Sequence, residues 1–214
     1  MKMKKYNIFC CGVGGQGIVT LGQILKIAGV DANLRVIGTE TRGATMREGS
    51  VTSTVRFGIM EKGEEVDERM QLYAGRIGTG TADMIIASEP QEGLRWAQYA
   101  NQKSIYAVNE YPMPSADNIV AGVHYPTKEE WTNSLKNLTP KVYSMNASMI
   151  AKEKFGGFQL MNVVLMGFAM GCDPNFPVTM DQMKKTLETM WPKSAEKNKN
   201  ALQIGYDEAK KLVK

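Results

Sequence analysis

Short apolar runs organise this chain, some with the spacing of strands and others with the spacing of helices. Residues 6–11 form an apolar run that glycines stop, which predicts a buried first strand. The next apolar positions recur at helical spacing before a stop at Gly29, namely Ile18, Leu21, Leu25 and Ala28. Residues 50–57 then alternate between two faces, which predicts a second long strand.

Further strands are predicted from β-rich runs between turn residues, at 34–37, 84–87, 105–108 and 142–145. Helix starts are marked by capping residues, which are Ser88 with Gln91, Thr127 with Glu130, Asn146, Thr179 with Gln182, and Ser194. This alternation predicts an α/β fold, with a Rossmann-like, doubly wound, mainly parallel sheet and helices on both faces. We expect one domain over residues 1–214, in which residues 175–214 form a C-terminal helical extension.

The composition is that of a soluble globular protein, with 43% hydrophobic and 22% charged residues. The net charge of +4 comes largely from lysines at 2–5 and 193–214, and no aromatic residues interleave with them to stack on bases. The most apolar stretch, 161–172, is too short to span a bilayer, and the N-terminal residues lack the core of a signal peptide. We therefore expect a cytoplasmic protein with no nucleic-acid or membrane partner.

Metal-binding residue types are scarce. Three cysteines, Cys10, Cys11 and Cys172, are too few and too badly spaced for a four-cysteine iron–sulfur or zinc site. Cys10 and Cys11 are neighbours on a predicted strand, so their side chains should point to opposite faces as buried thiols. His124 is the single histidine. We expect no metal site in this chain.

A glycine-rich loop follows the first predicted strand and opens the first predicted helix. Gly12, Gly14 and Gly17 match the G-x-G-x-x-G pattern, in which glycines allow close backbone approach and the helix start presents N–H groups to an anion. Two interpretations stay open: a nucleotide or phosphate site, or a tight turn at Gly15 packed against another protein. A dinucleotide site also needs an acidic residue after the second strand; Glu40 has that spacing but lies in an apparent loop.

The most unusual segment is 40–51, where two arginines, two glutamates and two glycines follow one another closely. One interpretation is an exposed charged turn. The other is a docking or anion-binding loop, in which Arg42 and Arg47 offer planar guanidinium groups to a carboxylate or phosphate.

These motifs, taken in order, resemble the gamma-type domain of the 2-oxoacid (pyruvate) ferredoxin oxidoreductase family. Within that family the chain is most similar to the beta subunit of indolepyruvate ferredoxin oxidoreductases. The resemblance covers essentially the whole chain and rests on the segments 12–22, 40–51, 55–58, 108–109 and 162–167. Arg42 stands where such subunits often carry histidine and Glu48 replaces a glycine, so the identity of the 2-oxoacid stays open.

The resemblance implies a small subunit of a thiamine-dependent enzyme that converts a 2-oxoacid to an acyl-CoA and reduces ferredoxin. Thiamine diphosphate, Mg and [4Fe–4S] clusters are then expected on a larger catalytic subunit, with coenzyme A as co-substrate. The small subunit is expected to bind none of these alone and to help enclose the active site, excluding water from reactive intermediates.

The residues expected to position a cofactor or dock the partner are Gly12, Gly14, Gly15, Gly17, Glu40, Arg42 and Arg47. No residue of this chain is expected to be catalytic. The alternatives are a stand-alone NAD-dependent dehydrogenase and a non-enzymatic nucleotide-binding module. Tyr99 and Lys103 have the Tyr-x-x-x-Lys spacing of some dehydrogenases, but they straddle a predicted helix end, and we interpret the match as coincidence.

Overall fold

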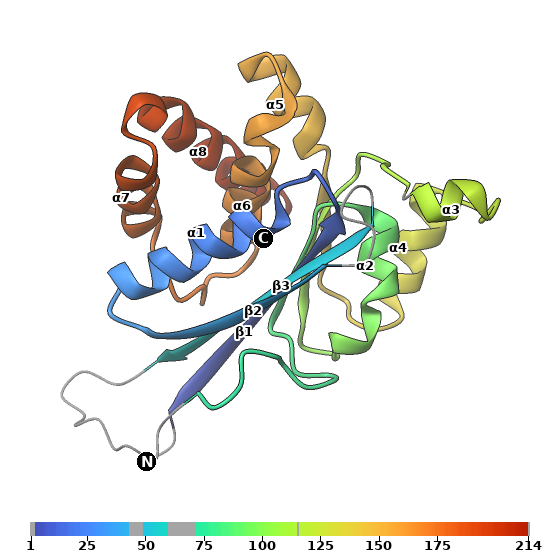
Figure 1. Ribbon diagram of the computed structural model, residues 1–214, viewed down its shortest axis with the longest axis horizontal. Helices are drawn as coiled ribbons and strands as arrows, with labels where there is room; N and C mark the ends of the chain where they lie inside the picture. The colour runs from blue at the N-terminus through green and yellow to red at the C-terminus, as the bar shows by residue number, and fades with distance from the viewer. Residues whose placement is uncertain (1–2, 43–48, 60–71, 115, 214) are drawn as a thin grey trace.

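The computed structural model describes residues 3–42, 49–59, 72–114 and 116–213, with the backbone only at Arg42, Ala116 and Asp117. Its centre is a six-stranded sheet in the order β2-β3-β1-β4-β5-β6 (Figure 1). The strands are β1 (Lys4–Val13), β2 (Arg35–Arg42), β3 (Ser50–Ile59), β4 (Met84–Ala87), β5 (Ile105–Asn109) and β6 (Val142–Met145).

The sheet is mostly parallel with one antiparallel strand in it. β1, β4, β5 and β6 pair in parallel, whereas β3 is antiparallel to both of its neighbours, β1 and β2. The short connection between β2 and β3, residues 43–49, accounts for this, because parallel neighbours need a crossover of roughly a dozen residues or more. The predicted mainly parallel α/β fold is confirmed.

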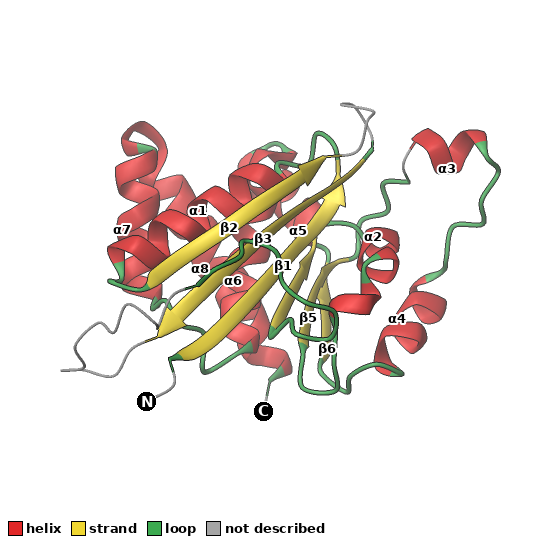
Figure 2. Cartoon of the chain, turned by 60° about the horizontal axis from the view of Figure 1, so that its bottom comes forward, coloured by secondary structure: helices red, strands yellow, loops and turns green. Residues whose placement is uncertain are grey.

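Helices cover both faces of the sheet (Figure 2). One face packs against α1 (Ile18–Asp31), α5 (Ala147–Phe155), α6 (Met161–Cys172), α7 (Met180–Met190) and α8 (Ala195–Leu212). The other packs against α2 (Pro90–Arg95) and α4 (Lys128–Lys136), while the short α3 (Ala116–Val120) stands away from the body. Successive β1 residues alternate between the two cores: Cys10 lies in the first and Cys11 in the second, as predicted.

The last helix packs closely on the apolar helix of the core. A Cβ added at Gly205 of α8 would lie 1.8 Å from the carbonyl oxygen of Val164, and one at Gly167 of α6 would lie 2.0 Å from that of Leu202. The two helix backbones are therefore in direct contact. The C-terminal helices thus belong to the helical layer that covers one face of the sheet.

Several element boundaries differ from those that the sequence predicts. The capping boxes at Thr127 and Thr179 are confirmed. The predicted cap at Ser88 is wrong: the N-cap of α2 is Glu89, whose side chain accepts a hydrogen bond from the Glu92 N–H. The interpretation of Glu40 as a loop residue is also wrong, because β2 continues to Arg42 as an edge strand paired with β3 on one side.

Candidate functional site

A groove of about 1120 Å³ lies where the loops after β1, β5 and β6 meet. The carboxyl ends of parallel strands share one edge of a sheet, and in α/β folds this edge is the usual place for ligands. The groove is lined by segments far apart in sequence, namely 15–17, 111–114, 156–163 and the first turn of α8, with Ser148 and Lys152 from α5.

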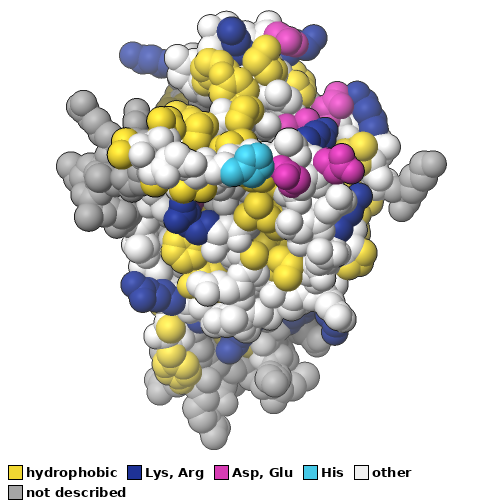
Figure 3. Space-filling model, turned by 90° about the vertical axis from the view of Figure 1, so that its right-hand side faces the viewer, with side chains coloured by type: hydrophobic (Ala, Val, Ile, Leu, Met, Phe, Trp, Pro, Cys, Tyr) yellow, Lys and Arg dark blue, Asp and Glu magenta, His cyan; other side chains and the backbone are white. Residues whose placement is uncertain are grey.

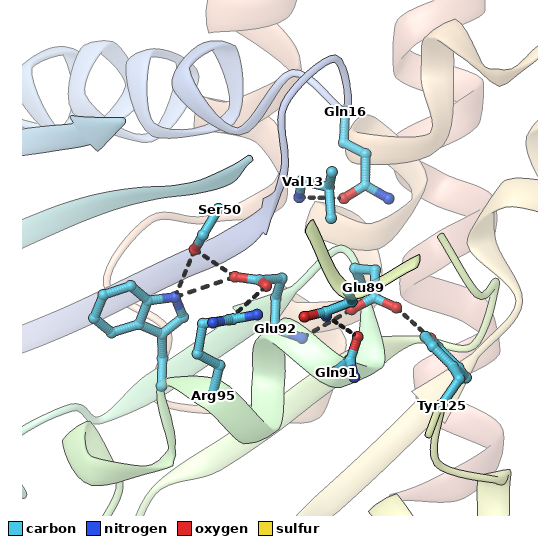
Figure 4. A network of polar contacts seen from close by, with 10 residues as sticks. Val13, Gln16, Ser50, Glu89, Gln91, Glu92, Arg95 and Tyr125 are labelled. Atoms are coloured by element: carbon cyan, nitrogen blue, oxygen red, sulfur yellow. Dashed lines mark hydrogen bonds and ion pairs between the residues drawn. The ribbon is translucent and has the colours of Figure 1, made fainter. Parts of the chain in front are cut away.

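The glycine loop forms one wall of the groove and is held by its own side chains. Gln16 accepts a hydrogen bond from the Val13 N–H at 2.8 Å (Figure 4). Gln16 also donates one to the Ser88 carbonyl at 3.1 Å, and Asn162 donates to the Gln16 carbonyl. Gly15 and Gly17 have φ angles of 95° and 76°, which favour glycine. These contacts and backbone angles give the loop a defined shape.

Gly12 and Gly14 have structural roles beside the groove. A Cβ at Gly12 would lie 2.6 Å from the side-chain oxygen of Gln16, so a side chain at this position would displace Gln16 from its hydrogen bond to the Val13 N–H. The Gly14 N–H donates a 2.8 Å hydrogen bond to the carbonyl of Gly49. Gly14 thereby ties the glycine loop to the end of the 43–49 connection.

A polar network reaches the groove through Ser148 and Asn162, and the sequence patterns did not assign it to the site. Asn109, fully buried at the end of β5, donates hydrogen bonds to the Ser88 carbonyl at 3.0 Å and to the Ser148 hydroxyl at 2.9 Å. Ser88 in turn donates to Asn162 at 3.0 Å. Asn109 and Asn162 both lie in segments that carry the family resemblance, and that resemblance was the signal in the sequence that could have identified them as site residues.

The groove has the charge expected for an anion site. Among the described residues that line it there is no Asp or Glu, and Lys152 contributes a positive charge. Gly17 and Leu160, the N-caps of α1 and α6, also line it, and neither provides a side-chain cap. Helix starts carry partial positive charge, although at α6 the Met161 N–H already donates to the Phe158 carbonyl.

An aromatic pair adds an apolar side to the groove. The rings of Tyr111 and Phe158 are 5.5 Å apart, and the Lys152 ammonium lies 5.8 Å from the Phe158 ring centre. Phe158 is 46% exposed. The groove therefore combines anion-binding groups with a surface for a flat or aliphatic group.

Of the remaining predicted site residues, Glu40 does not line the groove. Glu40 forms an ion pair with Lys26 of α1, with 2.5 Å between Nζ and Oε1. Arg42 ends β2 at the same edge of the sheet as the glycine loop, since Val51 is the pairing partner of both Arg42 and Gly12. Arg47 lies outside the described residues.

Two buried glutamates beside this edge were also missed, because the sequence pattern around α2 gives no sign that they are buried. Glu89 and Glu92 are each 1% exposed. Glu92 accepts hydrogen bonds from Ser50, from Arg95 at 2.8 Å and from the Trp96 indole at 3.3 Å (Figure 4). Glu92 thus holds the first residue of β3.

Glu89 accepts hydrogen bonds from the Tyr125 hydroxyl, from the Glu92 N–H at 2.8 Å and from the Met113 N–H at 3.4 Å. Burial raises the pKa of the Glu89 carboxyl, while these donors act in the opposite direction. A buried acid with a raised pKa is common at functional sites, but it also occurs in structural networks.

The dehydrogenase-like pair does not form a site. Tyr99 stacks on Phe9, with ring centres 4.4 Å apart, and does not line the groove. Lys103 is exposed in the turn before β5, at the amino end of the strand, whereas the groove lies at the carboxyl ends.

The described residues do not fit a metal or iron–sulfur cluster. They contain no group of three or more His, Cys, Asp or Glu side chains placed to hold a metal ion. Cys10, Cys11 and Cys172 are buried free thiols. No described helix is long and apolar enough to cross a membrane.

A family model described as "Pyruvate ferredoxin/flavodoxin oxidoreductase" matches residues 7–208. The chain belongs to this family. It is 33% identical to indolepyruvate oxidoreductase subunit IorB of Thermococcus kodakarensis, with 99% of each chain covered. The subunit of the same name from Archaeoglobus fulgidus is 35% identical, with 96% of each covered. Because the chain belongs to this family and matches these separate subunits along nearly its whole length, it is an oxidoreductase subunit.

Solved structures have the same fold at lower identity. The pyruvate oxidoreductase subunit PORC of Thermotoga maritima superposes with a TM-score of 0.67 at 18% identity, covering 95% of this chain and 96% of that one. A 2-oxoglutarate:ferredoxin oxidoreductase from Magnetococcus marinus has a TM-score of 0.68 at 19% identity, covering 99% of this chain but 31% of that chain. The fold therefore occurs both as a separate chain and within a longer one.

Proposed function

We propose that the chain is the small subunit of a thiamine-dependent 2-oxoacid:ferredoxin oxidoreductase of the indolepyruvate, or aryl-pyruvate, type. The observation that carries the proposal is the family match over residues 7–208, together with relatives of the same length that bear the indolepyruvate name. The partner is a larger catalytic subunit, ferredoxin is the acceptor, and the complex works in the cytoplasm. Residues 1–214 act as one domain, with 175–214 as its helical extension.

The reacting groups belong to the partner in this proposal. Thiamine diphosphate with Mg supplies the carbanion chemistry of oxidative decarboxylation, and [4Fe–4S] clusters carry the electrons to ferredoxin. The lack of a fitting cluster site among the described residues is compatible with this division. No residue of this chain takes part as acid, base or nucleophile.

The small subunit's own contribution is binding and enclosure. The groove faces the phosphate groups of coenzyme A with the backbone of Gly15 and Gly17, the start of α6 and the Lys152 ammonium. The Tyr111–Phe158 pair meets an apolar part of the same molecule. Gly12 and Gly14 hold this geometry, while Glu40, Arg42 and Arg47 contact the larger subunit or an anion held between the two chains.

Reconstitution tests the activity. The two subunits are co-expressed, and coenzyme A-dependent viologen reduction is measured with indolepyruvate, pyruvate and 2-oxoglutarate. We expect co-purification and the fastest reduction with indolepyruvate. The larger subunit alone is the control, and full turnover without the small subunit would contradict the proposal.

A lysine pair on one helix tests the groove. Lys152→Gln should raise the KM for coenzyme A by roughly two- to fivefold, because a charge opposite a partly exposed phosphate contributes up to about 1 kcal/mol. Lys154→Gln is the matched control, since Lys154 is an exposed lysine of the same helix that does not line the groove. Equal KM values for coenzyme A in the two variants would show that Lys152 does not contribute to binding it.

A further inference from the structure

The segment between β5 and α4 forms one wall of the groove. We call residues 111–125 the strap; the structure describes it except at position 115 and for the side chains of 116 and 117. It leaves the end of β5, carries α3 away from the body and returns to α4 (Figure 2). Residues 111–114 and Ile119 of the strap line the groove, so the position of the strap sets the width of the groove.

The aliphatic side chains of the strap are largely exposed to solvent. Ile119, Val120 and Val123 are 65%, 88% and 50% exposed. Figure 3 looks onto the side of the molecule that carries α3, and hydrophobic side chains are visible on its surface there. Beyond the packing of Tyr111 on Phe158, burial of apolar area is therefore a weak anchor for this segment, and polar contacts are needed to hold the rest of it.

Those contacts converge on the first turn of α2. The carboxylate of Glu89 accepts hydrogen bonds from the Met113 N–H near the beginning of the strap and from the Tyr125 hydroxyl at its end. Asn118 of α3 donates to the side chain of Gln91 at 2.6 Å. Glu89 thus holds the strap near both of its ends, and Gln91 holds its middle; Figure 4 shows the contact between Glu89 and Tyr125.

Capping α2 does not explain why this residue is a glutamate. Asp, Asn, Ser and Thr are the usual N-cap residues, and each reaches the helix N–H with a shorter side chain. Burying a carboxylate also costs free energy, and burial raises the pKa of Glu89. The extra methylene lets Glu89 cap α2 with one oxygen, Oε2, and hold the strap with the other, Oε1.

We infer that Glu89 is a positioning residue that holds the strap against the body and so fixes the apolar wall of the groove. The effect of Glu89 on coenzyme A binding rests on the proposed function, whereas the contact between Glu89 and the strap can be tested on the lone chain. The strap then forms a preorganised wall, and the ligand need not order this segment when it binds.

Two conservative changes separate holding the strap from capping the helix. Glu89→Asp keeps a good N-cap but shortens the reach to Tyr125, and Tyr125→Phe removes the hydroxyl from the strap side. Glu92→Asp is the matched control, because Glu92 is equally buried in α2 and its hydrogen-bond partners are Ser50, Arg95 and Trp96 rather than strap residues.

The first measurement is the rate at which thermolysin cleaves the lone chain within the strap, before its exposed aliphatic residues. We expect roughly a tenfold increase for Glu89→Asp and for Tyr125→Phe, the size expected for a lost hydrogen bond to a charged group. The double variant should cleave no faster than either single one, and Glu92→Asp should match the wild type within about twofold. Wild-type cleavage rates in both test variants would overturn the inference.

The second measurement uses the complex with the larger subunit. We expect the KM for coenzyme A to rise about tenfold in Glu89→Asp and Tyr125→Phe, with kcat unchanged, because the strap shapes binding rather than chemistry. Faster cleavage with an unchanged KM would overturn the positioning role, since the strap would then be held for another reason. If the wild-type complex shows no coenzyme A-dependent turnover, the proposed function fails, and the cleavage rates still decide whether Glu89 holds the strap.

Discussion

At the scale of single residues, burial decides the chemistry of groups that would otherwise be reactive. Cys10 and Cys11 are fully buried on opposite faces of β1, and burial raises the pKa of both thiols. Burial likewise raises the pKa of Cys172 to about 12. Since the thiolate is the reactive form, these cysteines act as small apolar core residues.

We expect none of the three thiols to react quickly with a disulfide reagent such as DTNB in the native protein at neutral pH. All three should react at once in concentrated urea, because unfolding removes the burial that suppresses the thiolate. A native thiol that reacts as fast as free cysteine would contradict this account.

The buried carboxyl of Glu89 predicts a dependence of stability on pH. Burial raises its pKa above the ordinary value of 4.5, so the folded state binds the proton more tightly than the unfolded state does. The contribution of Glu89 to the free energy of unfolding should therefore fall as the pH rises from about 4, and level off above the raised pKa.

Urea titrations of the wild type and Glu89→Gln between about pH 4 and pH 7 check this sign, since glutamine does not titrate. The free energy of unfolding of the wild type, relative to the variant, should be greatest at the acid end. An advantage of the wild type that grows toward neutral pH would mean that its hydrogen-bond donors outweigh burial.

At the scale of elements, the close crossing of α6 and α8 attaches the C-terminal helices to the sheet. Glycines at the crossing let the two backbones touch, and the apolar residues of α6 are buried almost throughout. The sequence signals the helices but not this contact.

Gly205→Ala should lower the free energy of unfolding by about 1–3 kcal/mol, because its Cβ would overlap the Val164 carbonyl and push the helices apart. This outweighs the gain of up to about 1 kcal/mol that alanine brings to a helix interior. Asn200→Ala, at an exposed position of the same helix, is the control and should be neutral or slightly stabilising. Thermal and urea melts compare the two variants.

At the scale of the whole molecule, the carboxyl edge of the sheet gathers the groove, the strap and the start of the 43–48 segment. Gly14 and Glu92 hold the residues that follow this segment, through Gly49 and Ser50. The described ends of this connection, the backbone of Arg42 and residues Gly49 and Ser50, therefore lie at the same edge of the sheet as the glycine loop.

Removal of both arginines, Arg42→Ala with Arg47→Ala, should weaken association with the larger subunit. Losing one member of a desolvated charge pair can cost roughly 2–5 kcal/mol, whereas exposed pairs contribute about 0–1 kcal/mol. The melting temperature of the lone subunit should hardly change.

Arg76→Ala with Lys103→Ala removes the same charge from two exposed positions outside this edge and should leave association intact. Co-purification and a binding isotherm measure the effect. Equal association of the two double variants would show that the arginine segment is an ordinary charged turn.

Local signals in the sequence determined much of the fold. The periodicity of apolar residues predicted the strands and most helices, and the capping boxes at Thr127 and Thr179 placed two helix starts correctly. The glycine pattern predicted a tight loop before the first helix, because such a turn needs φ angles that glycine adopts, as at Gly15 and Gly17; β1 however continues through Gly12 to Val13, two residues beyond the predicted strand end. These features depend on residues within a few positions of one another.

Only the tertiary structure decided what depends on distant partners. β2 continues through the polar residues Glu40–Arg42 because an edge strand needs pairing on one side only, and β3 supplies it. Glu89 and Glu92 are buried because Tyr125 and Ser50, far away in the chain, complete their hydrogen bonds. The groove exists because four distant segments meet at one edge of the sheet, and local sequence patterns do not encode such long-range proximity.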